Sequence, residues 1–133
     1  EKHLAEEAGH DAMLLSDLLA MGVSSIPYDY TASQLAGSQY YLIAHHHPAL
    51  LLGYMGVLES SSLNLVDIEK VEKEHSCRLS AVRHHAEHDP EHFSDLEKMC
   101  QLMSPELQEA IAWNASGVKQ ILSAQFERWQ HAQ

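Results

Sequence analysis

The chain has 133 residues, 45% of them apolar, which is enough for a single domain over residues 1–133 with a hydrophobic core and excludes a disordered protein. Eight lysine and arginine residues against 19 aspartate and glutamate residues give a formal net charge of -11. Such a surface repels phosphates and anionic lipid headgroups, so we expect neither a nucleic-acid partner nor a membrane partner.

The two cysteines, Cys77 and Cys100, are too few for a disulfide framework and lack the spacing of a zinc or redox motif. No signal peptide is visible, and the longest apolar run, residues 49–58, is far shorter than the roughly 20 residues of a membrane span. These features predict a soluble cytoplasmic protein. A helical pattern is already running at Glu1, which is not a methionine, so we expect the natural sequence to continue before it.

Apolar residues recur at helical spacing in the first part of the chain and predict a helix over about residues 2–21, which Gly22 is placed to end. A loop follows. Thr31 or Ser33 can then cap a second helix that runs toward His47.

Pro48 suits the first turn of a third helix, residues 49–59, which is apolar nearly all round and should be the most buried element. A short serine-rich break separates it from a helical region over about residues 65–88, in which an interruption near Ser76 is expected.

Pro90 lacks an N–H and crowds the carbonyl four residues back, so we expect the chain to kink or to restart a helix there. The helical pattern resumes to about Met103. Ser104 and Pro105 are a strong start for a last helix that ends near Trp129. No strand pattern is present, and the sequence predicts an all-α bundle of about six to seven helices.

Several charged residues point toward the predicted core. A helix advances about 100° per residue, and relative to Val82 this places His85, Asp89 and His92 in the core-facing sector. The other charged or imidazole side chains of this segment fall on the opposite face, which we interpret as solvated: His84, Glu87, His88 and Glu91.

The first predicted helix brings Glu7 and His10 together at the edge of its apolar stripe, whereas Glu6 faces away. Their Glu-x-x-His spacing lets one helix present a carboxylate and an imidazole to the same metal or pair of metals, as in diiron bundles. Glu59 ends the apolar third helix, where a carboxylate is costly unless it is paired, protonated or bound to a cation.

Three carboxylates and three imidazoles are therefore offered by separate helical segments, a set that suits two metal ions: Glu7, His10, Glu59, His85, Asp89 and His92. Mixed oxygen and nitrogen ligands without a thiolate favour iron or manganese over structural zinc.

Ordinary structural roles stay open for these residues. Glu7 and His10 can form an exposed helical pair, Glu59 can simply end its helix, and Asp89 can cap a helix that starts at Pro90. The histidines before Pro48 are interpreted as packing groups rather than ligands: His45, His46 and His47.

Three segments of the chain resemble the heme-oxygenase-like diiron oxidases, a superfamily related in fold to thiaminase II: residues 3–22, 45–59 and 81–96. The third segment is the most specific, because its His-x3-Asp-x2-His pattern is similar to the last ligand helix of the family. Carried over by position, the ligands of the family fall on the six residues that the helical faces select.

The resemblance implies a heme-oxygenase-like bundle that binds two Fe(II) ions and uses O2 to oxidise a small molecule, such as a fatty acid, an amino acid or an amine. A homodimer is compatible with it. This chain departs from the family in lacking the N-terminal helix and in having a short segment between Glu59 and His85. Four side chains are candidates to line a substrate pocket, although their helical spacing also suits core packing: Tyr40, Tyr41, Tyr54 and Met55.

Two other functions are open. A protein of the same fold can store or sense metal, or act through partners without catalysis. A thiaminase-like hydrolase is the second alternative; it needs a nucleophilic cysteine, and neither Cys77 nor Cys100 has an evident activating base.

Overall fold

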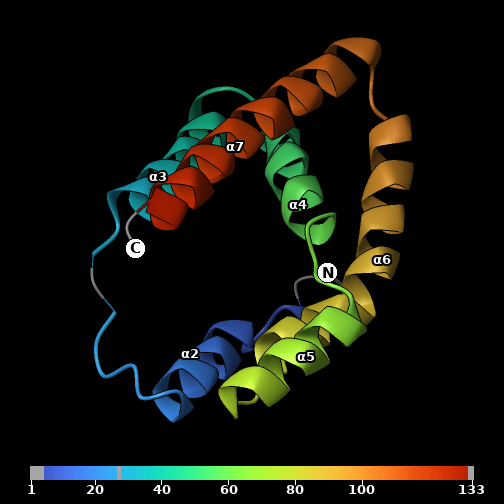
Figure 1. Cartoon of the computed structure of the whole chain (residues 1–133). Helices are drawn as coiled ribbons and strands as arrows, with labels where there is room; N and C mark the ends of the chain where they lie inside the picture. The colour runs from blue at the N-terminus through green and yellow to red at the C-terminus, as the bar shows by residue number, and fades with distance from the viewer. Residues whose placement is uncertain (1–4, 27, 132–133) are drawn as a thin grey trace. The chain divides into compact units, whose positions relative to one another are not determined.

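The computed structural model describes residues 5–26 and 28–131. This part of the chain holds α-helices and a short 3-10 helix without any strand, which confirms the predicted all-α class. The predicted start of the first helix, near Lys2, lies outside the described residues. In chain order the elements are α2 (His10–Ala20), α3 (Tyr30–His45), η1 (Pro48–Leu50), α4 (Leu51–Glu59), α5 (Leu65–His75), α6 (Ser80–Gln101) and α7 (Pro105–His131) (Figure 1).

Several helix ends follow the predicted signals. Gly22, just after the end of α2, adopts a left-handed φ of 83°, which glycine accepts without steric cost. Pro48 occupies the first turn of η1, and α7 starts at Pro105 with the Ser104 hydroxyl accepting from the Leu107 N–H at 3.4 Å. Ser76 ends α5 in a left-handed conformation, where the interruption was expected.

Other boundaries differ from the prediction. The first helix is not continuous: Gly9 has a φ of 95°, and α2 begins only at His10. Neither Thr31 nor Ser33 caps α3; the cap is Asp29, whose Oδ1 accepts from the Ala32 N–H at 2.9 Å. A side-chain acceptor at the N-cap stabilises the start of a helix, and Asp29 supplies it before Thr31 is reached.

Pro90 lies inside α6, which runs from Ser80 to Gln101, so the helix restart considered for this proline does not occur. Asp89, as the residue before Pro90, is therefore a mid-helix residue and not an N-cap. Pro90 has no N–H to donate to the carbonyl four residues earlier, that of Ala86, yet the helix continues through it.

Contacts between residues divide the chain into two compact units, which are described separately. The first unit covers the described residues of 1–27 and 59–92, and contains α2, α5 and the N-terminal part of α6. Asp17 of α2 accepts from the Ala81 N–H at 2.8 Å, and Glu72 of α5 accepts from the Leu79 N–H at 2.9 Å. A helix N-terminus exposes N–H groups and partial positive charge, so the two carboxylates tie α2 and α5 to the start of α6.

The second unit covers 28–58 and the described residues from 93 onward, with α3, η1, most of α4, the rest of α6 and α7. Its core has two apolar clusters. One is formed by Leu35, Val57 and Val118, and the other by Leu52, Leu96 and Ile111. No helix in the described ranges has the length and apolar character that crossing a membrane requires.

Gly53 marks the closest approach of α4 to α7. A Cβ built there would collide with the carbonyl oxygen of Ile111 and would lie 2.9 Å from the backbone nitrogen of Ala115. Both atoms belong to helix backbone, which cannot move aside as a flexible side chain can. Gly53 therefore lets the two helices meet backbone to backbone.

We expect Gly53→Ala to destabilise the protein by about 1–3 kcal/mol, because the added methyl group forces α4 away from α7. Gly37→Ala is the matched control: Gly37 lies inside α3 and a Cβ there meets open space. That substitution should stabilise the protein by about 0.5–1 kcal/mol, because alanine favours helix over glycine. Urea unfolding measures both, and a Gly53 variant as stable as the Gly37 variant would contradict the close approach.

Candidate metal centre

Five of the six predicted ligand residues form two groups that could each hold a metal ion. Glu7, His10 and His85 make one group; Glu7, Glu59 and His92 make the other. Within each group, one ligand atom from every residue lies within 4.8 Å of the others. All five belong to the first unit, and Glu7 is common to both groups.

Three local structures position these side chains. His85 and His92 are seven residues apart on α6, which is two helical turns and places both on one face. Glu59 is the last residue of α4. Glu7 lies in the bend before α2, and His10 is the first residue of α2. The prediction that one continuous helix carries both residues is therefore wrong.

The bend nevertheless brings Glu7 and His10 together. Their Oε2 and Nδ1 atoms are 3.0 Å apart, the distance of a hydrogen bond. The left-handed Gly9 turns the chain between them, so a loop conformation supplies the contact that helical spacing was expected to supply.

Asp89 belongs to neither group of ligand atoms, and its role as a ligand stays a prediction. Its Oδ1 lies 2.9 Å from Nδ1 of His85, and its carboxyl group is also hydrogen-bonded to Glu59. Asp89 is 3% exposed. A carboxylate on one ring nitrogen of a histidine fixes the ring and its tautomer, which leaves the other nitrogen for a metal.

The second group is the more buried. Glu59 and His92 are each 8% exposed, whereas the side chains of Glu7 and His85 are 30% and 35% exposed. Nδ1 of His92 lies 3.4 Å from Oε2 of Glu59 and 3.8 Å from Oε1 of Glu7. Burial, with the neighbouring carboxylates of Asp89 and Glu7, raises the pKa of Glu59 from 4.5 to about 8.

The donor set is of a kind that can bind metal ions. Oε1 of Glu7 is buried and accepts no hydrogen bond from the described residues. Glu7, Glu59 and Asp89 concentrate negative charge in a region of low dielectric, which is unfavourable without a proton or a cation. Carboxylate oxygens and imidazole nitrogens together are suitable ligands for iron or manganese.

Glu6 and His84 lie beside this site, although the sequence predicted both on helix faces that point away from the core. Oε2 of Glu6 is 3.5 Å from Nε2 of His92, because the bend before Gly9 changes the direction in which Glu6 points. The His84 ring packs edge-on against His10 with 4.5 Å between ring centroids. Burial, with the nearby histidines, lowers the pKa of His84 and favours its neutral form.

The three consecutive histidines belong to neither group. His45 ends α3 and His46 is its C-cap, while Nδ1 of His47 accepts from the Ala49 N–H at 3.1 Å and caps η1.

Comparisons with models of known protein families, with curated proteins and with solved structures found no match to this chain. A metal centre is thus supported by the residues and their geometry alone.

We expect Glu59→Gln to reduce the pH dependence of stability in the metal-free protein. The folded-state pKa of Glu59 lies above its ordinary value, so its contribution to stability is fully present below about pH 4.5 and is lost as the pH rises through about 8. Urea unfolding of the wild type should show a fall on the order of a few kcal/mol across this range, and the variant should show less.

The control for this experiment is Glu87→Gln, which removes an exposed carboxylate from the same region of α6. It should keep the wild-type decline. Equal pH profiles for the Glu59 variant and the wild type would show that Glu59 is not held among other carboxylates in solution.

Proposed function

We propose that this chain is a non-heme diiron oxidase or oxygenase that uses O2 to oxidise a small organic substrate. The observation that supports this most is the presence of two ligand groups that share Glu7, because a carboxylate common to two sites can bridge two metal ions. The resemblance to the heme-oxygenase-like diiron oxidases selects the same residues and extends the proposal to their fold.

Each residue has a distinct task in this proposal. Glu7 would hold both ions, His10 and His85 would complete one site, and Glu59 and His92 would complete the other. Asp89 holds the His85 ring through the 2.9 Å contact. Two bound iron ions supply the reduction of O2, which protein side chains alone cannot perform.

The finer parts of the proposal follow the resemblance. The substrate is a fatty acid, an amino acid or an amine, iron is the preferred metal with manganese as the alternative, and a homodimer is compatible with the proposal. We place it in the cytoplasm, which is compatible with Cys77 and Cys100 both being free thiols.

We expect the wild type to bind about two Fe(II) ions per chain under anaerobic conditions. Glu7→Ala should weaken both sites, because it removes the shared ligand, whereas His10→Ala should weaken one and leave the other. Asp89→Ala should lower affinity by about 10–100-fold, since the His85 ring loses its support. Metal analysis after equilibrium dialysis measures these changes.

His75→Ala is the matched control for the metal experiment, because His75 is an exposed histidine at the end of α5 in the same unit. It should leave iron binding unchanged. If Glu7→Ala bound as much iron as His75→Ala, the shared carboxylate would not be a ligand.

Consumption of O2 separates an oxidase from a protein that only stores or senses metal. The anaerobic Fe(II)-loaded wild type should consume O2 faster than free Fe(II) at the same concentration, and the zinc-loaded protein should consume none, because zinc has no accessible redox chemistry. An oxygen electrode follows the reaction. Tight iron binding with O2 uptake no faster than free Fe(II) would favour the non-catalytic alternative.

The hydrolase alternative has less support. Cys100 packs against an apolar core cluster, where burial raises the pKa of its thiol and keeps it from forming a thiolate. Cys77 lines a pocket together with His75, yet no hydrogen bond joins the two side chains in the described part of the chain. A nucleophilic cysteine needs a base within reach.

A further inference from the structure

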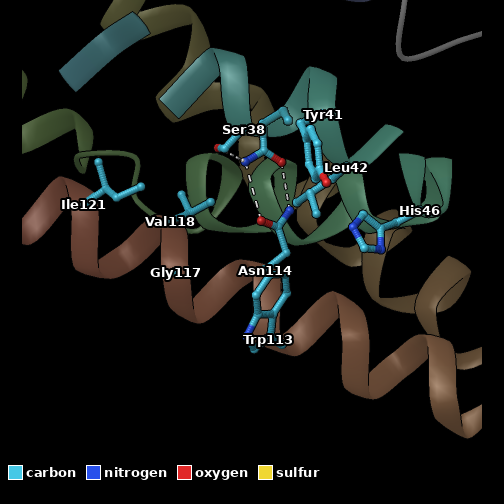
Figure 2. Close-up of a pocket in the computed structure, with 10 residues that line it drawn as sticks. Ser38, Tyr41, Leu42, His46, Trp113, Asn114, Gly117, Val118 and Ile121 are labelled. Atoms are coloured by element: carbon cyan, nitrogen blue, oxygen red, sulfur yellow. Dashed lines mark hydrogen bonds between the residues drawn. The ribbon is translucent and has the colours of Figure 1, made fainter. Parts of the chain in front are cut away.

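A pocket of about 410 Å³ lies between α3 and α7 in the second unit, apart from the residues of the metal centre. Figure 2 shows Tyr41 and Leu42 on one side of it and Trp113, Val118 and Ile121 on the other. Most of its lining is apolar, and its volume is in the range of small-molecule sites.

The polar floor of the pocket is a pair of buried amides, Gln39 and Asn114. The Asn114 amide nitrogen donates to Gln39 and to the carbonyl of Leu50, both at 2.8 Å. The Gln39 amide nitrogen donates to Ser38 at 3.1 Å and to Asn114 at 3.4 Å (Figure 2). Each amide group has two N–H donors, so all four donors are used within the protein and only carbonyl lone pairs are left for a ligand.

A second hollow of about 440 Å³ adjoins the first, because Leu42, His46 and Trp113 line both. It adds the carboxylates of Glu106 and Glu109, from the first turns of α7. Hydrogen bonds from Ser104 and from its own backbone lower the pKa of Glu106 and keep it ionised. The two hollows form one groove, apolar at one end and acidic at the other.

Gly117 lines the apolar end and lies in the middle of α7. A Cβ built there meets nothing within 4 Å, so neither packing nor an unusual φ requires a glycine. Glycine weakens a helix interior relative to alanine. The residue thus keeps space open in the groove at a cost in helix stability.

We propose that this groove binds a hydrophobic amine: an aryl or alkyl body lies against Tyr41, Trp113 and Gly117, and its ammonium group lies at Glu106 and Glu109. The ammonium group is favoured at the acidic end because that end is negatively charged, and the amide floor adds no free N–H donor that would repel it. The chain as a whole carries a net charge of -11, which attracts the same class of ligand. The site does not involve the metal centre, so either proposal can fail without the other.

The test compares three molecules that share one phenylbutyl body and differ in charge: phenylbutylamine, phenylbutanol and phenylbutyrate. Trp113 lines both hollows, so tryptophan fluorescence of the full chain reports binding. The amine should bind at least about tenfold more tightly than the acid, with the alcohol between them, because only the charge at the Glu109 end changes. Equal affinities for the amine and the acid would overturn the proposal.

Two substitutions locate the site. Gly117→Leu fills the apolar end and should weaken amine binding at least about tenfold, whereas Gly117→Ala, the matched control, should bind nearly as the wild type does. Glu109→Gln should lower affinity for the amine several-fold and leave that for the alcohol unchanged. Circular dichroism checks that each variant keeps its helices.

The remaining outcomes are also decisive. Amine binding that Gly117→Leu does not weaken would place the amine elsewhere and overturn the site. A wild-type dimer that Gly117→Leu converts to a monomer, with no amine bound, would show that a second copy of the chain covers the groove. Size-exclusion chromatography with light scattering distinguishes that case.

Discussion

The structure of the first unit depends on one electrostatic constraint, the crowding of carboxylates beside histidines at a partly dry position. Glu59 and Asp89 are both buried and hydrogen-bonded to each other, and Glu7 adds a third carboxyl group. Like charges in a region of low dielectric repel strongly, so a proton or a cation must compensate them. The raised pKa of Glu59 corresponds to compensation by a proton, and the proposed metal pair would compensate the same charges as cations.

Contacts at the start of α6 position the side chains of this cluster. His85, Asp89 and His92 all lie on α6. Asp17 from α2 accepts from an N–H in the first turn of α6, and Glu72 from α5 accepts from the N–H of Leu79, the residue just before α6. Capping by a neighbouring helix fixes both the direction and the rotation of α6. The face that carries the ligands is thereby fixed relative to α2, which begins with His10.

The sequence predicted the positions of the ligand-type residues best where they lie on one continuous helix. The spacing of His85 and His92 predicted a shared face because α6 is continuous there, and five of the six selected residues do come together. It was least informative at the turn around Gly9, where a left-handed residue breaks the expected helix and brings Glu6 near His92. The 2.9 Å contact between Asp89 and His85 depends on side-chain conformation, which spacing alone does not encode.

Polar groups are buried in both units, but they are satisfied in opposite ways. Gln39 and Asn114 satisfy their N–H donors with each other and with neighbouring groups of the protein, and they carry no charge. A neutral, internally bonded pair of this kind stabilises a core without any ligand. Glu7 and Glu59 instead bring ionisable oxygens together beside His92. Such a cluster is unfavourable by itself, so a proton or a cation is needed to stabilise it, and this contrast between the two units is why we propose the metal centre in the first.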